Sequence, residues 1–410
     1  MRIGGIGLFS AVVSYFFLLI QKVIPVKKGH LVFTSFNGHY SDNPKYISQK
    51  LHEIKPSSDI VWLVKKQYMS ELPRYVKTVD IDSPLAAFWQ KARAAVLVDN
   101  VYAGQEDTLT SDTRLSRLKF RIRSFLKNKK TRKVFTTWHG TPLKCMGRDQ
   151  LNSNILDFSC PQTTMLLGNQ YTLDIMQHLT FGKITMVLCG TPRNDPLFLP
   201  QASREELKEQ LGLPANKKVV LFAPTFRNDG NDIANTNVQR SGLNQLDSME
   251  FDKLFDVLGE RFDGEWVMVC RFHYHVEALV DWEGLQQKYP NKIINGNTHD
   301  DMAQYLACAD VLLTDASSSM YDFALTQKPC FLFFPDVEYY SHTERGFYTP
   351  IDDLPFPMAD TFSELLGTIS RFDAELYRQK VTAMLSNYGY VDDETSSERI
   401  ARHILAQITV

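Results

Sequence analysis

Short apolar runs alternate with helix-like patterns along most of the chain. Each run is rich in Val, Ile, Leu or Phe, and a segment with helical spacing of apolar residues usually follows it. This alternation is typical of parallel sheets covered by helices, so we expect an α/β fold. The runs predicted to be strands are 30–36, 60–65, 95–99, 134–138, 184–189, 219–223, 266–270, 311–314 and 330–334.

The number of predicted strands exceeds a six-stranded sheet, and 410 residues exceed the size at which a single core stops growing. A helix-like segment lies between Pro200 and Pro214 before a new strand begins, and we place the domain boundary there. We therefore expect three parts, which are a membrane-associated segment at 1–28, one domain at 29–200 and a second domain at 201–410.

The N-terminal segment differs from the rest of the chain. No residue from Ile3 to Gln21 is charged, whereas Lys22, Lys27 and Lys28 follow this run. The run is long enough for a transmembrane span, and its glycines and serines equally suit a helix lying in the membrane interface. No small-residue cleavage site follows it, which argues against a signal peptide. We expect membrane attachment by a span or an interfacial helix, with a helix packed on the protein's own core as the alternative. The lysines favour a cytoplasmic body.

Positive charge is concentrated in one stretch, although the formal net charge is only −2. Ten of the twenty residues 114–133 are Lys or Arg, and none is acidic. Leu115, Leu118, Ile122 and Phe125 recur within it at helical spacing. A basic amphipathic helix suits an anionic membrane surface, with a solvated helix face as the alternative. No aromatic stacking platform accompanies the charge, so we expect no nucleic-acid partner.

The sequence gives little support for a metal centre. The six cysteines are scattered, without a Cys-x-x-Cys pair or a histidine at metal-ligand spacing, and we interpret them as buried reduced thiols. Asp80 and Asp82 are the only acidic pair at one-residue spacing in a strand-like run, a pattern that is common by chance. We expect no metal and no cofactor.

Polar residues gather where the predicted strands end. In open parallel sheets, ligands bind beyond the carboxyl ends of the strands, and two domains with such loops imply a shared cleft. The polar segments that follow predicted strands are 138–144, 190–195, 224–229, 271–275 and 315–319.

Two histidines in these loops are candidate catalytic groups. His139 lies in a tight Gly-Thr-Pro turn near Lys144, and a neutral imidazole with a pKa near 6.5 can accept a proton from a hydroxyl. His273 follows Arg271, which suits stabilisation of charge on a diphosphate leaving group, and His275 is a rival for that role. A structural histidine, hydrogen-bonded in the turn, is the alternative for His139.

Hydroxyl and basic residues in the same loops are candidate anion ligands. Asp315, Ser317 and Ser318 stand at the start of a predicted helix, where free N–H groups suit a phosphate. A simple helix cap is the alternative. Arg193 and Arg227 each stand beside Asn and Asp, where surface ion pairs are the alternative.

In these segments the chain resembles the CDP-glycerol glycerophosphotransferases of teichoic acid and capsule synthesis. The matches occur in the family's order and are far more specific together than singly. Two departures leave the choice of donor open, because Ala316 stands where an aromatic residue is expected and Cys145 stands where a lysine is usual. The matching segments are 35–38, 40–44, 138–144, 190–195, 223–227, 314–315, 317–318 and 345–348.

The resemblance implies a GT-B-like pair of Rossmann-type domains whose parallel sheets face a shared cleft, with the donor held mainly by the second domain. It implies two essential histidines, His139 as the base for the acceptor hydroxyl and His273 as stabiliser of the departing charge, although these roles could be exchanged. The other residues expected to bind substrate are Thr141, Lys144, Arg193, Asp195, Thr225, Arg227, Arg271, Asp301, Asp315, Ser317, Ser318 and Arg345.

The implied reaction is transfer of glycerol phosphate from CDP-glycerol to a membrane-bound acceptor, a lipid-linked saccharide or poly(glycerol phosphate), with release of CMP at the cytoplasmic face of a bacterial membrane. Several alternatives stay open. The donor could be CDP-ribitol, and the apolar start without an extra large domain favours a priming enzyme over a polymerase. Another GT-B enzyme, such as a glycosyltransferase or a nucleotide-sugar epimerase, is the second hypothesis. A non-catalytic protein that binds a membrane surface is the third.

Overall fold

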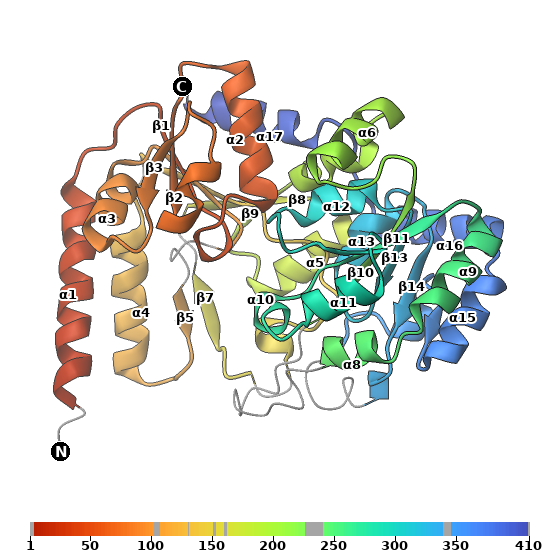
Figure 1. Cartoon of the computed structure of the whole chain (residues 1–410). Helices are drawn as coiled ribbons and strands as arrows, with labels where there is room; N and C mark the ends of the chain where they lie inside the picture. The colour runs from red at the N-terminus through yellow and green to blue at the C-terminus, as the bar shows by residue number, and fades with distance from the viewer. Residues whose placement is uncertain are drawn as a thin grey trace. The chain divides into compact units, whose positions relative to one another are not determined.

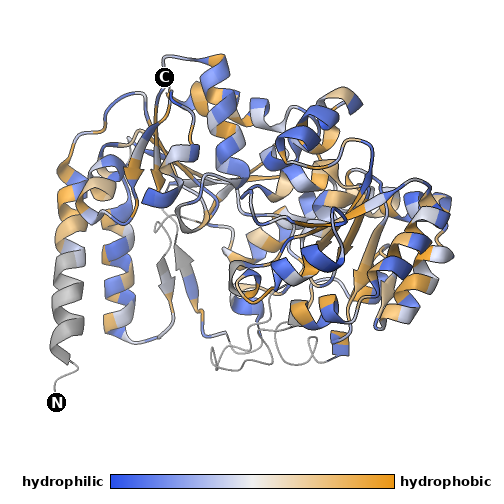
Figure 2. Ribbon diagram, in the orientation of Figure 1, coloured by the Kyte–Doolittle hydropathy of each residue, from blue (hydrophilic) through white to orange (hydrophobic). Residues whose placement is uncertain are grey.

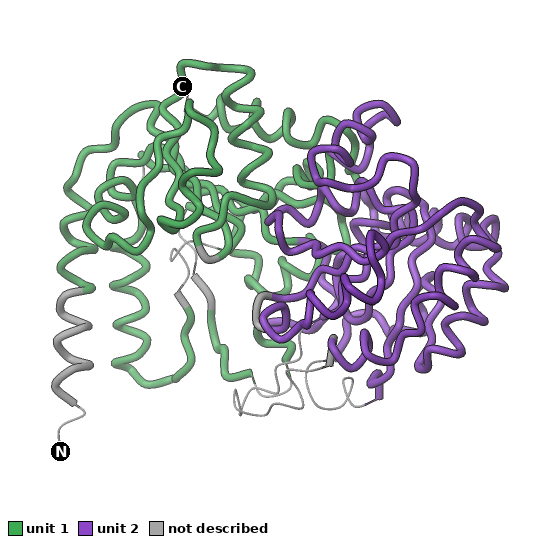
Figure 3. The backbone as a smooth tube through the Cα atoms, viewed as in Figure 1, with its two compact units in different colours: residues 1–139, 147–195, 391–410 green, residues 140–146, 196–390 purple. Residues whose placement is uncertain are grey.

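The computed structural model describes residues 4–101, 107–129, 131–150, 153–159, 162–225, 241–338 and 346–408. The chain forms two α/β units, which Figure 3 draws in different colours. Unit 1 comprises Met1–His139, Gly147–Asp195 and Val391–Val410, and unit 2 comprises Gly140–Met146 and Pro196–Tyr390.

The centre of unit 1 is a seven-stranded parallel sheet with the strand order β3-β2-β1-β4-β6-β8-β9. Its inner strands β1 and β4 are buried along their whole length and apolar except for one polar end residue each, His30 and Asp99, as is typical of parallel strands covered by helices. The strands are β1 (His30–Phe33), β2 (Asp59–Val64), β3 (Lys77–Asp80), β4 (Val96–Asp99), β6 (Lys133–Thr136), β8 (Thr163–Leu167) and β9 (Thr185–Leu188).

Helices cover this sheet, and a short antiparallel pair, β5 (Asp107–Leu109) with β7 (Asp157–Ser159), contacts α4. The helix α17 at the end of the chain packs against α2, and its buried Ile400, Ala401 and Ile404 join the core under β1 and β2. The helices are α1 (Gly4–Val23), α2 (Asp42–Ile54), α3 (Pro84–Arg93), α4 (Arg114–Lys127), α5 (Gln170–Leu179) and α17 (Ser396–Ile408), with short 3-10 helices η1 (Phe36–Gly38), η2 (Lys66–Glu71), η4 (Gly147–Asp149) and η5 (Pro192–Phe198).

Unit 2 has its own parallel sheet, with the strand order β12-β11-β10-β13-β14-β15. Its hydrophobic strands lie among helices whose outer faces are hydrophilic (Figure 2). The strands are β10 (Lys218–Ala223), β11 (Trp266–Cys270), β12 (Ile293–Asn295), β13 (Val311–Thr314), β14 (Cys330–Phe333) and β15 (Met358–Ala359). The helices are α6 (Gln201–Gln210), α8 (Ser241–Asp247), α9 (Phe251–Phe262), α10 (Tyr274–Glu277), α11 (Trp282–Lys288), α12 (Met302–Cys308), α13 (Ser319–Ala324), α15 (Phe362–Ser370), α16 (Ala374–Asn387) and the 3-10 helix η6 (Ile351–Asp353).

These elements confirm the expected α/β class with parallel sheets, and each predicted run contains a strand. The division of the chain differs from the predicted split at residues 200 and 201. Val391–Val410 lies in unit 1, because the apolar face of α17 completes the core of that unit. The short segment Gly140–Met146 lies in unit 2.

The apolar N-terminal segment forms the helix α1, which lies beside α4 (Figure 1). Phe17 packs edge-on against Phe88 of α3 at 4.9 Å between ring centroids. Lys22 Nζ donates to the carbonyl of Phe125 at 3.1 Å and lies 4.6 Å from the centroid of its ring. Among the described residues, the helices lack the combination of length and apolarity that a transmembrane span needs.

The basic stretch 114–133 does not form one continuous exposed helix. The helix α4 ends at Lys127, and the side chains of Lys129 and Arg132 beyond it are buried. Lys129 Nζ and Arg132 Nη2 each donate to the carbonyl of Ala92, at 3.0 Å. These two cations therefore satisfy carbonyl groups at the end of α3, and only part of the positive charge faces solvent.

Candidate functional site

His139 follows the carboxyl end of β6, as the sequence pattern predicts. The turn that carries it is tight, because Trp138 has a φ of 53° and Gly140 has a φ of 124°. A non-glycine residue in the left-handed region is strained, and such strain is concentrated at functional sites. The rings of Trp138 and Phe36 lie 4.0 and 4.9 Å from the imidazole, between centroids.

The imidazole of His139 has a defined orientation. Its Nδ1 lies 3.3 Å from the carbonyl oxygen of Asn100. A carbonyl oxygen only accepts, so Nδ1 carries the proton in the neutral ring and Nε2 carries the lone pair. In this tautomer, Nε2 is the ring nitrogen that can accept a proton.

The surroundings also set the protonation of His139. Burial lowers the pKa of His139, the Asn100 carbonyl and the Asp42 carboxylate raise it, and Arg193 lowers it; the net effect is a pKa below the ordinary value. A lower pKa favours the neutral imidazole near pH 7, which is the form that accepts a proton.

Two residues of the loop after β9 have structural contacts in unit 1. Arg193 Nη1 donates to Asp42 Oδ1 at 3.2 Å. Asp195 Oδ2 accepts from the backbone N–H of Ser397 at 3.0 Å and from the hydroxyl of the same residue. Burial raises the pKa of Asp195 and these hydrogen bonds oppose the rise. Asp195 therefore joins the loop to the first turn of α17.

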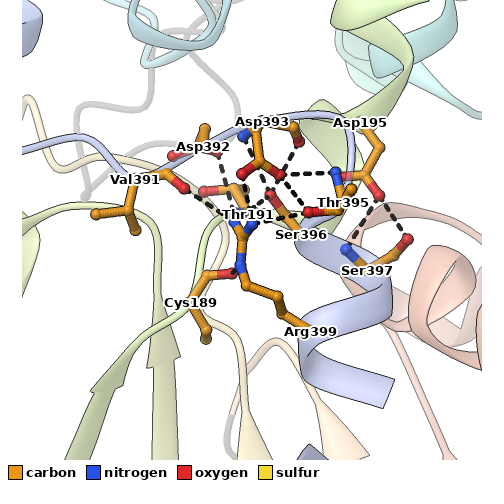
Figure 4. Close-up of polar contacts among 10 residues, drawn as sticks. All are labelled: Cys189, Thr191, Asp195, Val391, Asp392, Asp393, Thr395, Ser396, Ser397 and Arg399. Carbon is orange, nitrogen blue, oxygen red and sulfur yellow. Dashed lines mark hydrogen bonds and ion pairs between the residues drawn. The ribbon is translucent and has the colours of Figure 1, made fainter. Parts of the chain in front are cut away.

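Further contacts between this loop and the C-terminal segment appear in Figure 4. Asp392 Oδ1 accepts from the N–H of Thr191 and from Nδ2 of Asn194, both at 3.0 Å. Arg399 donates to the carbonyls of Cys189 and Val391 at 3.1 and 2.9 Å. The segment that returns from unit 2 thus fixes the loop 190–195.

In unit 2 the short segment Gly140–Met146 carries two predicted substrate ligands. The hydroxyls of Thr141 and Tyr390 lie 2.7 Å apart. Lys144 forms a β-bridge with Phe347. These contacts attach the segment after His139 to the body of unit 2.

His273 follows β11 at the position before α10, and its side chain is exposed and makes no capping hydrogen bond. Its neighbour Arg271 donates to the carbonyls of Gly296 and Asp300, both at 2.6 Å, and to that of His299. Burial lowers the pKa of Arg271, while Tyr305 and nearby carboxylates oppose this. Arg271 therefore organises the loop after β12.

The buried carboxylate of Asp315 joins two strand ends. Its Oδ1 accepts from the N–H of Thr225 at 2.8 Å, and its Oδ2 accepts from Nε2 of Gln245 at 3.3 Å. The hydroxyl of Ser317 lies 2.8 Å from that of Ser319 in the first turn of α13. This arrangement brings the predicted residues after β10 and β13 together.

Two other predicted residues have simpler placements, and two more are not described. Ser318 is the N-cap residue of α13, without a side-chain capping bond. Asp301 is buried and caps α12 by accepting from the N–H of Ala303 at 3.1 Å. Arg227 and Arg345 lie outside the described residues.

Sequence reasoning missed the residues that support His139. Asp42 and Asn43 lie in a segment that matched the family, but neither was chosen as a site residue. Asn100 directly follows a predicted strand, so the rule that polar residues gather at strand ends could have found it. Asp42 and Asn43 are the first two residues of α2, and Asn100 directly follows β4.

Comparison with known proteins gives one consistent family. Residues 15–406 match the sequence profile of CDP-Glycerol:Poly(glycerophosphate) glycerophosphotransferase. A teichoic acid poly(glycerol phosphate) polymerase of Staphylococcus epidermidis is 27% identical, over 93% of this chain and 51% of the polymerase. This chain therefore spans about half the length of that relative. A teichoic acid glycerol-phosphate transferase of Staphylococcus aureus is 26% identical, over 95% of each protein.

The fold has a solved counterpart as well. The structure of the wall teichoic acid polymerase TagF matches with a TM-score of 0.74 and 25% identity. The match covers 96% of this chain and 92% of that one, so it includes the elements of both units.

Proposed function

Because the chain belongs to the CDP-glycerol:poly(glycerophosphate) glycerophosphotransferase family, we propose that it transfers glycerol phosphate from CDP-glycerol to a hydroxyl of a membrane-bound acceptor. The acceptor class is a lipid-linked saccharide or a poly(glycerol phosphate) chain, and CMP is released. The observation that carries this proposal is the family match together with a histidine, His139, whose Nδ1 is held by a carbonyl.

In the proposed reaction, Nε2 of His139 takes the proton of the acceptor hydroxyl while the hydroxyl oxygen attacks the phosphorus next to glycerol. The bond from this phosphorus to the bridging oxygen of the diphosphate breaks, and CMP leaves with the electron pair. His273 stabilises the charge that gathers on the leaving phosphate. The protein contributes positioning and electrostatics, as in other phosphoryl transfers.

We assign the donor to unit 2, where the polar strand ends of the parallel sheet suit a nucleotide. Thr225, Asp315, Ser317 and Ser318 come together after β10 and β13, which supports a diphosphate-binding role for this edge. The remaining proposed donor contacts come from Thr141, Lys144, Arg227, Arg271, Asp301 and Arg345.

We further propose that unit 1 attaches to the cytoplasmic face of the membrane through α1 and α4. Phe16 and Leu19 of α1 are 58% and 54% exposed, and Leu115, Leu118 and Phe125 of the basic helix α4 are 60%, 54% and 67% exposed. Exposed apolar side chains beside Lys and Arg suit the interface of an anionic bilayer.

The test is CMP release by the purified full-length chain in detergent. We expect release only when CDP-glycerol and a suitable acceptor are both present, and less or none with CDP-ribitol. His139→Ala should lower kcat by about 10²-fold or more, the usual contribution of a general base. His178→Ala is the matched control, since His178 is exposed and pairs with Asp149 on the surface.

Two results would contradict the proposal. Full turnover by both His139→Ala and His273→Ala would remove the mechanism. Turnover of a UDP-sugar without use of CDP-glycerol would favour a glycosyltransferase.

A further inference from the structure

We propose that the ion pair of Asp42 and Arg193 is the positioning element for His139 in the transfer reaction. Neither residue needs to touch a substrate in this role. The inference rests on the proposed function of His139 as the base, and it assigns Arg193 a role different from the substrate contact expected from the sequence.

One arm of the arrangement runs through Asn100. The carbonyl of Asn100 accepts from the Nδ1–H of His139 at 3.3 Å. The side chain of the same residue is buried, and its Nδ2 donates to Asp42 Oδ2 at 2.8 Å and to Ser35 Oγ at 3.1 Å. Asp42 therefore fixes the residue whose carbonyl orients the imidazole.

A second arm runs through Asn43, which is fully buried. Its Nδ2 donates to the carbonyl of Trp138 at 3.2 Å, in the peptide that leads into His139. Its Oδ1 accepts from the backbone N–H of Arg193 at 3.0 Å. The backbone and the ring of His139 are thus held separately: the first set of contacts ends at the carboxylate of Asp42 and the second at the backbone of Arg193, the two residues that form the ion pair.

The ion pair itself is shielded. The side chains of Asp42 and Arg193 are 9% and 15% exposed, and their contact is 3.2 Å. Shielded charges are screened less by salt than surface charges, so each acts more strongly on its surroundings. Asp42 also has a φ of 59°, and a strained non-glycine residue persists only when its surroundings hold it.

The two charges act on His139 in opposite directions. Asp42 raises the pKa of His139 and Arg193 lowers it, in addition to the lowering by burial and the raising by the Asn100 carbonyl. Asp42 acts from the first residue of α2 and Arg193 from η5. Neutralising one charge should therefore shift the pKa one way, and neutralising the other should shift it the opposite way.

The experiment is the pH profile of kcat/KM for CMP release in Asp42→Asn and Arg193→Gln. The acid limb of this profile, the fall in kcat/KM at low pH, reports protonation of His139. We expect it to move to lower pH in Asp42→Asn and to higher pH in Arg193→Gln, each by roughly half a pH unit or more. Both variants should also lose kcat, since the arms loosen. Arg193→Lys keeps the charge and should keep the wild-type limb. Arg402→Gln breaks an exposed pair on α17 and should change nothing.

If Asp42 and Arg193 had only a structural role, both variants would lose kcat while the acid limb stayed in place or moved in the same direction in both. Either result would overturn the inference. Histidine titration by NMR, in full-length protein with ¹³C-labelled histidine and His139 assigned through His139→Gln, gives the same comparison without turnover. A wild-type chain that releases no CMP would refute the proposed function, and the NMR shifts would still decide whether the ion pair acts on His139.

Discussion

The two candidate catalytic histidines have contrasting environments. His139 is partly buried, lies against two aromatic rings and is held by a backbone carbonyl, whereas His273 is exposed before a four-residue helix. A general base needs its lone pair oriented and its pKa set before substrate arrives. A group that stabilises a leaving phosphate acts on charge that the substrate brings. The roles that we propose, His139 as the base and His273 as the stabiliser, follow this contrast.

The supports of the two histidines differ in the same way. Around His139, residues from the start of α2, from the segment after β4 and from η5 converge, and the C-terminal segment holds the loop that leads into η5. Beside His273, one long side chain, Arg271, holds the carbonyls of a single loop. We infer that the surroundings of His139 depend on contacts between distant segments, whereas the loop beside His273 depends on Arg271 and on Asn297, whose side chain bonds the backbone of Phe272 at 2.9 and 2.6 Å.

The largest expected effect tests the contacts between the C-terminal segment and unit 1. Gly190 has a φ of 85°, and an added Cβ would lie 2.7 Å from Ser396 Cβ and from Arg399 Nη2. Gly190→Ala should reduce the free energy of unfolding by about 3 kcal/mol, because overpacking costs about 1 to 3 kcal/mol and the left-handed backbone disfavours a side chain. Thermal unfolding followed by calorimetry measures this.

Gly182→Ala separates the two causes. Gly182 has a φ of 65° but no atom within 4 Å of an added Cβ, so this variant should cost only about 1 kcal/mol. Equal losses in both variants would mean that the contacts of the C-terminal segment contribute little to the stability of unit 1.

Local sequence patterns predicted much of the fold, and the omissions have physical reasons. The apolar strands were found because buried parallel strands are continuous runs of Val, Ile, Leu and Phe. The strand β8 was missed because Thr163–Leu167 lacks β-branched apolar residues, and β3 because its residues are partly exposed and two of them are charged. The return of 391–410 to unit 1 is a long-range contact, which no local pattern contains.

The same distinction applies to the site. The rule that polar residues gather at strand ends indicated the positions of His139, Arg193 and Asp315. A position in the sequence does not tell whether the side chain faces a ligand or the rest of the protein. Asp195 contacts Ser397, about two hundred residues later in the chain, and Asp42 contacts Arg193. Such partners become visible only when the fold brings the segments together.

An intermediate effect is expected at Arg271 of unit 2. Arg271→Met removes three donated hydrogen bonds to carbonyls, and it should lower the free energy of unfolding by about 2 kcal/mol. It should also raise the KM for CDP-glycerol more than it lowers kcat, because the loop with Asp301 loses its support. Calorimetry and CMP-release kinetics measure the two effects.

The controls compare charge with geometry. Arg271→Lys keeps the charge, but an ammonium group lacks the planar fork, so it should recover only part of the loss. Arg378→Met removes an exposed pair with Glu375 and should change stability by less than about 0.5 kcal/mol. Full recovery in Arg271→Lys would show that charge alone matters at this position.

The smallest effect concerns the amino ends of the unit 1 strands, opposite the edge that carries His139. Asp59 at the start of β2 accepts from Lys27 and His30 at 2.7 and 2.8 Å, and from Lys77 at 2.5 Å. Burial opposes ionisation of Asp59, but these three partners outweigh it and hold the pKa of Asp59 well below its usual value.

The pKa of Asp59 is lower in the folded protein than in the unfolded chain, so ionised Asp59 stabilises the fold above its usual pKa, near 4. This stabilisation is lost as the pH falls towards the lower pKa that Asp59 has in the folded protein. Asp59→Asn should therefore lower stability at pH 7 by no more than about 1 kcal/mol, since two of the partners are largely exposed. The difference from wild type should shrink below about pH 4, as melting temperatures across this range would reveal.

The pH profile of CMP release should stay unchanged in Asp59→Asn, because the contacts of Asp59 with Lys27, His30 and Lys77 do not include the residues that hold His139. A moved acid limb in Asp59→Asn would mean that His139 responds to charge across the whole of unit 1, and the special position of Asp42 and Arg193 would be lost.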